Sequence, residues 1–207
     1  MIIISFLAED KAMFKKLIIS SLALLVSLLS NNAMAIEEPK YKVLKTAEDS
    51  SENWELRHYE SFNIAKVYVK AGENNASSYG FRPLANYIFG GNDESKKMAM
   101  TAPVMQQSID DNLHQISFVM PEKFNLEDLP KPDNQKVKIE QYPESKFLVV
   151  RFSGGWSAKK WKKRALKLQE QAEKNNFEVL STPIYARYND PWTPSFFRRN
   201  EILIAVK

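Results

Sequence analysis

Cysteine is missing from this 207-residue sequence, and several kinds of chemistry are excluded with it. Without a thiol, the chain forms no disulfide, thiolate metal site or iron–sulfur cluster, and it has no cysteine nucleophile. The same absence excludes a lipoprotein anchored through an N-terminal cysteine. A cysteine-free chain suits an oxidising compartment, where a free thiol is a liability.

Histidine and glycine are also scarce, with two and six residues respectively. The sequence contains no phosphate-binding glycine loop, no zinc-ligand spacing and no nucleophile elbow. Its composition is otherwise that of a globular protein, since 44% of the residues are hydrophobic and 26% are charged. The net charge of +4 permits binding to nucleic acid or to an anionic membrane only where the charges cluster.

Residues 1–35 have the layout of a secretory signal peptide. Lys15 and Lys16 precede an apolar run over 17–29, and Ala33 and Ala35 supply a small-x-small cleavage pattern. A transmembrane helix needs about 20 apolar residues, so we expect no stable membrane span after cleavage. An uncleaved N-terminal anchor is the alternative. The chain is therefore predicted to be periplasmic or secreted.

The start of the chain and its domain boundaries follow from the same segment. Glu9 and Asp10 are acidic where a signal peptide is normally basic, so Met13 looks like a better start and residues 1–12 like a misassigned extension. We expect an N-terminal extension over 36–52, followed by one domain over 53–207.

The hydrophobic periodicity of the mature chain predicts a mixture of strands and helices. An amphipathic pattern over 157–175 and a shorter one over 77–89 predict two helices. Strands are expected over 54–59, 63–70, 100–107, 115–120, 137–141, 146–152, 182–188 and 201–206.

The second half of the domain resembles the first. Tyr59 and Tyr142 each end one strand just before the next begins, and Gly72 and Gly154 follow that second strand. Each half thus has two strands, a helix and further strands, and neither could bury its sheet face alone. The sequence predicts an α+β fold, a distorted β-barrel of two pseudo-symmetric strand–helix–strand repeats with two main helices.

Several ordered motifs identify a resemblance that covers roughly residues 54–206. The chain resembles the SOUL haem-binding protein family, in its bacterial exported form, and this resemblance also implies a distorted barrel with two helices and pseudo-twofold symmetry. The matching segments are 55–59 (ELRHY), 80–88 (GFRPLANYI), 90–92 (GGN), 97–104 (KMAMTAPV), 188–191 (YNDP) and 198–201 (RRNE).

The resemblance implies haem or a related porphyrin as the ligand. In this family the proposed axial ligand of the iron is the histidine of the first-strand motif, which is His58 here. Other branches of the family lack it, and His58 read alone is an ordinary strand histidine. His114, which follows the acidic turn at Asp110 and Asp111, is expected to be a solvated loop residue.

The first predicted helix offers a second set of candidate cofactor-binding residues. Tyr79, Arg82 and Asn86 fall on one side at helical spacing, where Arg82 could pair with a propionate. Trp192 and Phe196 lie in a proline-bounded loop, where aromatic side chains form a pocket wall or act as packing plugs.

These features support a periplasmic protein that binds, buffers or carries haem or another tetrapyrrole. A general small-molecule-binding domain, like the effector-binding domains of some transcription regulators, is the first alternative. An enzyme is a weaker one, with Tyr188, Arg199 and Glu201 as polar groups but no activated nucleophile. The oligomeric state stays open.

The second predicted helix also carries many basic residues. We expect them to form a solvated face, with an anionic-membrane contact as the alternative, and export argues against nucleic acid. They are Lys159, Lys160, Lys162, Lys163, Arg164 and Lys167.

Overall fold

The structure is a computed structural model that describes residues 36–47 and 53–207. Residues 1–35, where the signal peptide is predicted, lie outside the described residues. The two helices are α2 (Glu73–Ile88) and α3 (Ala158–Lys174), and two short 3-10 turns are η1 (Leu126–Asp128) and η2 (Ser195–Phe197). The strands are β1 (Tyr41–Thr46), β2 (Trp54–Tyr59), β3 (Phe62–Lys70), β4 (Val104–Ser108), β5 (Leu113–Val119), β6 (Lys138–Tyr142), β7 (Ser145–Phe152), β8 (Ile184–Arg187) and β9 (Asn200–Val206).

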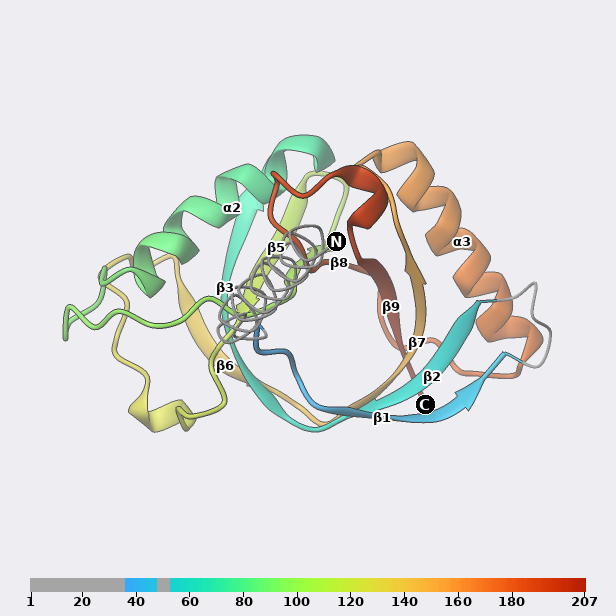
Figure 1. The fold of residues 1–207 in the computed structure, drawn as a ribbon, viewed down its shortest axis with the longest axis horizontal. Helices are drawn as coiled ribbons and strands as arrows, with labels where there is room; N and C mark the ends of the chain where they lie inside the picture. The colour runs from blue at the N-terminus through green and yellow to red at the C-terminus, as the bar shows by residue number, and fades with distance from the viewer. Residues whose placement is uncertain (1–35, 48–52) are drawn as a thin grey trace, which may run out of the picture. The chain divides into compact units, whose positions relative to one another are not determined.

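All nine strands of the described residues join one antiparallel sheet in the order β1-β2-β7-β9-β8-β4-β5-β3-β6. The sheet curls into an open barrel, and α2 and α3 lie on its outer face, each over a different part of the sheet (Figure 1). Helix α2 packs on β3 and β5, whereas α3 packs on β7 and β9. The fold class predicted from the sequence is confirmed.

The predicted repeat is also confirmed by the strand order. The first repeat is β2-β3-α2-β4-β5 and the second is β6-β7-α3-β8-β9. Exchanging the two repeats maps the sheet order onto itself, with β8 and β4 at the centre. In the sheet, β2 of the first repeat pairs with β7 of the second, and β6 of the second repeat pairs with β3 of the first. Neither repeat therefore forms its sheet alone.

Strand alternation divides the core into three apolar clusters. On β9, Leu203 points into the barrel, whereas Ile202 and Ile204 point outward beneath α3. On β3, Ile64 points into the barrel and Ala65 outward beneath α2. The central strands are therefore buried on both faces, which explains why they read as nearly continuous apolar runs.

Several boundaries differ from those predicted. Helix α2 begins at Glu73, four residues early, and its N-cap is Gly72. The strand expected over 100–107 begins only at Val104, because the preceding Pro103 has no N–H to donate to a neighbouring strand. Strand β1 was not predicted, since its residues are mostly exposed and show no alternation; it pairs with β2 at the sheet edge. No helix of the described residues is long and apolar enough to span a membrane.

Candidate functional site

Five polar side chains form a buried network on the concave face of the barrel. Glu201 is fully buried, and its Oε2 accepts hydrogen bonds from Arg57 Nη1 and from the Tyr188 hydroxyl, both at 2.8 Å. Its Oε1 accepts from Arg199 Nε at 3.0 Å. Arg57 Nη1 also donates to the Tyr59 hydroxyl at 3.2 Å. The carboxylate is thus shared between two guanidinium groups and a phenol.

The network holds its members in fixed ionisation states. Burial alone would lower the pKa of Arg57, but the hydrogen bond and the charge of Glu201 raise it above its ordinary value. Burial and the charge of Glu201 together hold the pKa of Tyr188 well above 10.0. Neither group exchanges a proton near neutral pH, as a general acid or base must. The polar groups named for the enzyme alternative do meet, in a closed ion-pair cluster.

One apolar cavity lies in the barrel interior beside this network. It has a volume of about 20 Å³, which is space for about one water molecule. Pro39 lines it and belongs to the chain segment 37–40. That segment is held in place by the ion pair of Glu38 with Arg199 Nη1 at 2.8 Å. A tetrapyrrole does not fit this cavity, so the candidate sites described next are on the surface.

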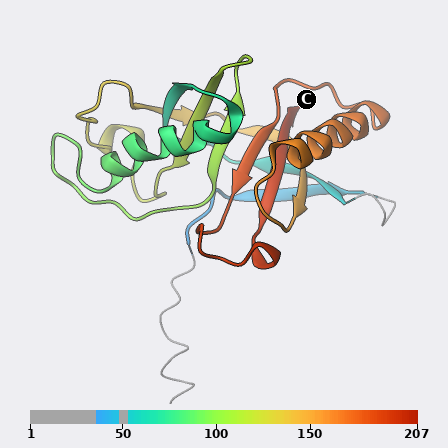
Figure 2. The ribbon, with the colours of Figure 1, turned by 90° about the horizontal axis from the view of Figure 1, so that it is seen from above.

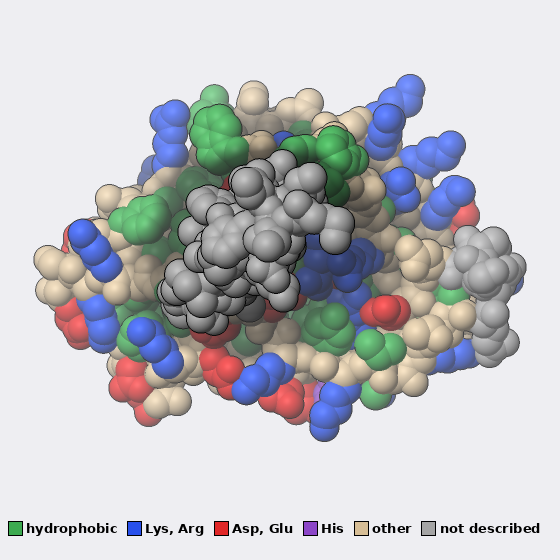
Figure 3. Space-filling model, viewed as in Figure 1, with side chains coloured by type: hydrophobic (Ala, Val, Ile, Leu, Met, Phe, Trp, Pro, Cys, Tyr) green, Lys and Arg blue, Asp and Glu red, His purple; other side chains and the backbone are tan. Residues whose placement is uncertain are grey.

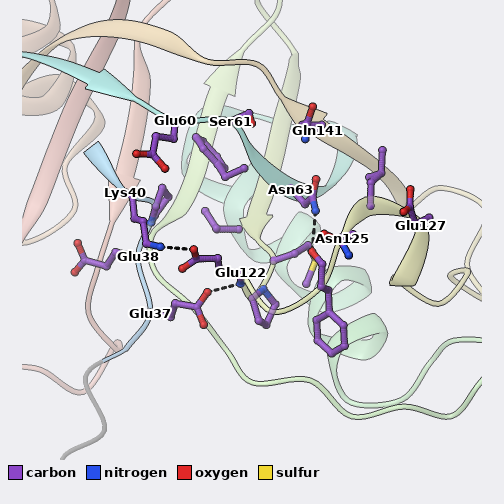
Figure 4. A pocket seen from close by; sticks show the side chains of 17 residues that line it. Glu37, Glu38, Lys40, Glu60, Ser61, Asn63, Glu122, Asn125, Glu127 and Gln141 are labelled. Atoms are coloured by element: carbon purple, nitrogen blue, oxygen red, sulfur yellow. Dashed lines mark hydrogen bonds and ion pairs between the residues drawn. The ribbon is translucent and has the colours of Figure 1, made fainter. Parts of the chain in front are cut away.

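A surface pocket of about 510 Å³ lies beside this segment (Figure 4). Phe62, Met120 and Phe124 give it an apolar floor. Lys40, its one lysine or arginine, is already paired with a glutamate. The size suits a ligand, but the charge repels the propionates of a haem and favours a cation. The acidic lining residues are Glu37, Glu38, Glu60, Glu122 and Glu127.

His58 lines a different depression, of about 360 Å³, on the outer face of β2 and β7. Its imidazole Nε2 lies 2.6 Å from Glu144 Oε1, and its side chain is 32% exposed. Leu180, Ala205 and Val206 supply apolar surface. Lys146 and Lys207 add two ammonium groups, and the Lys207 ammonium lies 3.7 Å from Glu178 Oε2 in an exposed ion pair. An imidazole backed by a carboxylate, an apolar surface and two cations together match the parts of a haem.

The structure separates His58 from the other candidate residues. His58 is in register with Lys146, which is in register with Val206 at the end of β9. The loop that carries Trp192 joins β9 at its beginning, Asn200, six residues away. At about 3.3 Å per residue this is a separation of roughly 20 Å along the sheet. A macrocycle on His58 therefore lies away from that loop.

The remaining candidates are exposed, and none lines the cavities described above. Tyr79, Arg82 and Asn86 share the solvent-facing side of α2, as their spacing indicates, and Tyr79 is 57% exposed. Trp192 and Phe196 are 91% and 68% exposed, so neither is a packing plug. Their role in cofactor binding stays a prediction.

His114 was predicted to be a solvated loop residue, and this is wrong. It lies on β5, is 2% exposed, and its Nδ1 lies 3.1 Å from Ser108 Oγ. The turn at Asp110 ends earlier than expected, so the strand begins at Leu113 and His114 is buried on the face beneath α2, together with Ile116. Its burial removes it from the candidate iron ligands.

Sequence reasoning also missed two groups that the fold brings to the sites. Arg57 was part of a quoted motif but received no role, although alternation places it with Tyr59 on the face opposite His58. Lys207 and Lys146 gave no local signal, because only the pairing of β7 with β9 and β2 brings them beside the histidine. Their contribution depends on strand register alone.

The curled sheet, its two outer helices and the ligand-sized surface depressions define an α+β barrel protein of the small-molecule-binding class. The chain belongs to the SOUL heme-binding protein family, which matches residues 36–205. This confirms the resemblance read from the motifs. The match includes residues 36–52, and β1 within them is part of the sheet.

Two curated relatives are similar over most of their length. Heme-binding protein 2 of Homo sapiens is 29% identical over 184 residues, which cover 84% of this chain and 88% of the relative. Heme-binding protein 2 of Mus musculus is 27% identical over 184 residues, covering 84% and 87%. Family membership and these relatives support haem as a ligand.

Solved structures show the same fold at lower sequence identity. The EcmrR C-terminal domain has a TM-score of 0.61 and 12% identity, with coverage of 75% of this chain and 97% of that one. A hydrolase from Listeria innocua has a TM-score of 0.54 and 12% identity, with coverage of 75% and 92%. These likenesses concern the barrel architecture alone.

Proposed function

We propose that this protein is a periplasmic haem- or porphyrin-binding protein that buffers or carries the tetrapyrrole rather than transforming it. Its site is the His58 depression on the outer face of β2 and β7. The observation that carries the proposal is the meeting of an imidazole, an apolar surface and two ammonium groups in one depression of about 360 Å³. Family membership supplies the ligand class.

Each part of the depression has a defined role in binding. Glu144 fixes the imidazole of His58 through Nε2, so Nδ1, which has no partner among the described residues, is the nitrogen free to donate to iron. Leu180, which is 58% exposed, supplies the main apolar surface for the macrocycle. Lys146 and Lys207 pair with the propionates, which are the anionic ends of the ligand. Bound haem would supply an iron that accepts this nitrogen.

A hemin titration of the full chain tests the proposal. We expect a saturable change in the Soret band, and in His58→Ala a shift of the Soret position together with weaker binding. Glu144→Gln should weaken binding about tenfold, because the carboxylate tunes the ligand only through the imidazole. No saturable Soret change in the unmodified protein would overturn haem binding itself.

A matched control separates the His58 depression from the α2 face. Arg82→Gln removes one exposed cation from α2 and should leave the Soret spectrum and the affinity unchanged. Lys146→Gln removes one cation from the depression and should weaken binding a few-fold. The opposite pattern would move the site to α2 and reject the role given to His58. Periplasmic location is tested by fractionating cells that express the full chain.

The acidic pocket near Lys40 favours a second candidate function, a binding domain for apolar cations. The Glu122 amide donates to the Glu37 carboxylate and ties two walls of the pocket together, and the lining charge is strongly negative. A thermal-shift assay with benzyltrimethylammonium as probe should then show stabilisation that Glu60→Gln weakens. Stabilisation by hemin alone would reject this second function.

A further inference from the structure

Three of the most exposed apolar side chains of the described residues lie together in the loop that precedes β9. Trp192 is 91% exposed, Phe196 is 68% exposed and Phe197 is 72% exposed, and the two phenyl ring centroids are 4.4 Å apart. We call these three residues the aromatic tip. The loop projects beyond the strands at one end of the barrel (Figure 2). Such a group of exposed aromatic side chains marks an interaction surface rather than a fold requirement.

The aromatic tip is held rigidly by hydrogen bonds around its base. Arg198 donates from Nε to the Thr193 carbonyl at 2.7 Å and from Nη2 to the Pro191 carbonyl at 2.6 Å. The Gly154 amide donates to the Ser195 carbonyl at 2.9 Å and ties the loop to the turn before α3. The aromatic rings are thus presented to solvent by a fixed backbone, and little ordering entropy is lost when they bind.

The turn at Gly154, which precedes α3, leads directly into the most basic segment of the chain. The first two turns of α3 carry the lysine cluster, defined as Lys159, Lys160, Lys162 and Lys163. All four are exposed, and none has an ion-pair partner among the described residues. Blue side chains along α3 stand beside apolar ones at the top of the molecule (Figure 3).

The position of the lysine cluster is unfavourable for the helix itself. The N-terminus of a helix carries partial positive charge, so lysines there cost stability, whereas acidic residues would stabilise it. The first turn of α3 has no acidic residue, and the N-cap Ser157 makes no side-chain capping bond. Helix stability therefore does not account for these cations.

We propose that the aromatic tip and the lysine cluster form one docking surface for an anionic lipid bilayer. The rings insert at the level of the headgroups, and the ammonium groups lie over the lipid phosphates. Charge complementarity and the shared turn at Gly154 and Gly155 support this assignment. A nucleic acid would need cations interleaved with stacking aromatics along a groove, whereas here the aromatics project together beside the cations.

The fluorescence of Trp192 tests the proposal locally. Trp54 and Trp161 are buried and Trp156 is only partly exposed, so Trp192, at 91% exposed, is the tryptophan most accessible to a quencher in water. Vesicles of phosphatidylcholine and phosphatidylglycerol in equal amounts should shift the emission to shorter wavelength and protect it from iodide. Pure phosphatidylcholine vesicles should do neither. The response should be much smaller in Trp192→Phe, where Trp156 remains, and unchanged in His58→Ala.

Charge variants measure the contribution of the lysine cluster. One lysine near an anionic surface contributes about fivefold to the affinity, so Lys159→Gln, Lys160→Gln and Lys163→Gln together should weaken binding roughly 100-fold. The matched control removes three exposed lysines remote from the cluster. Its substitutions are Lys131→Gln, Lys136→Gln and Lys138→Gln, and they should weaken binding far less.

A second pair of variants tests the apolar part of the docking surface, which is the aromatic tip. Phe196→Ser should weaken vesicle binding about tenfold, because one phenyl ring no longer leaves water. Ile109→Ser, at an exposed turn between β4 and β5, should leave it unchanged. Equal loss in both lysine triples, or no emission shift with anionic vesicles, would overturn the proposal. So would a Trp192 response to a single-stranded oligonucleotide and not to vesicles.

Discussion

Removing the carboxylate of Glu201 tests the buried network most directly. The side chain is fully buried and receives Arg57 at 2.8 Å, while Arg57 itself is 2% exposed. Glu201→Leu leaves the Arg57 guanidinium with the half-exposed Glu55, the Tyr59 hydroxyl and the ring of Tyr41 as partners. Breaking a buried pair in this way costs about 3–5 kcal/mol, a large part of the free energy of unfolding of an ordinary domain.

The effect can be measured by urea denaturation followed through tryptophan fluorescence. A loss of about 4 kcal/mol with a slope of about 2 kcal/mol per molar lowers the urea midpoint by about 2 M. Glu201→Gln keeps the shape and one hydrogen-bond acceptor, so its midpoint should fall by roughly half as much. Far-UV circular dichroism confirms that each variant is folded before denaturation.

Replacing Arg57 together with Glu201 should restore part of the lost stability. Adding Arg57→Met to Glu201→Leu removes the unpaired charge and fills the space with apolar atoms. The double variant should be more stable than Glu201→Leu by at least about 1 kcal/mol. Arg199 retains Glu38 as a partner in both variants, so it does not confuse the comparison. A double variant less stable than the single one would refute the reasoning.

Two further predictions concern stability. Three buried tyrosines have pKa values raised to about 12 from 10.0 mainly by burial, and the pKa of Tyr188 is also raised well above 10.0, so the unfolded chain loses these protons first. Stability should fall from pH 10 to pH 12 by at least about 4 kcal/mol per pH unit, as urea midpoints against pH would show. Tyr185→Phe should reduce this slope by about 1.4 kcal/mol per pH unit. Gly80→Ala would place a methyl group 2.4 Å from Ile116 Cγ1. The cost of this overpacking should exceed the gain in helix propensity, so the melting temperature should fall by about 4 °C. Gly72→Ala, with nothing within 4 Å of the new methyl, is the control; an equal melting temperature in both would contradict the overpacking. The tyrosines are Tyr59, Tyr87 and Tyr185.

Periodicity predicted the repeated elements well because both faces of the sheet and one face of each helix are buried. Trp161 and Leu168 lie at helical spacing, and both are buried beneath α3 as expected. Strand β1 escaped prediction because an edge strand with exposed side chains carries no alternating signal. His114 was misplaced for a different reason, since one residue of turn length decides which face a strand residue occupies.

The candidate site shows the same division. The His58 motif could be read in the sequence, and so could the exposed side of α2 with Tyr79 and Arg82. The distance between these two sets could not, because it depends on where β2 meets β7 and β9 in the sheet. Strand register, set by packing between residues far apart in the chain, separates the histidine from the aromatic loop by roughly 20 Å.

The amino-acid sequence by itself determined the absence of thiol chemistry, the family, the two helices and the twofold repeat, because these depend on composition and local periodicity. Only the tertiary structure decided that Arg57, Tyr188, Arg199 and Glu201 meet in one buried network. It also decided that the apolar cavity beside this network is too small for a tetrapyrrole. Both depend on contacts across the sheet, where residues more than a hundred positions apart share a low-dielectric interior that no local pattern specifies.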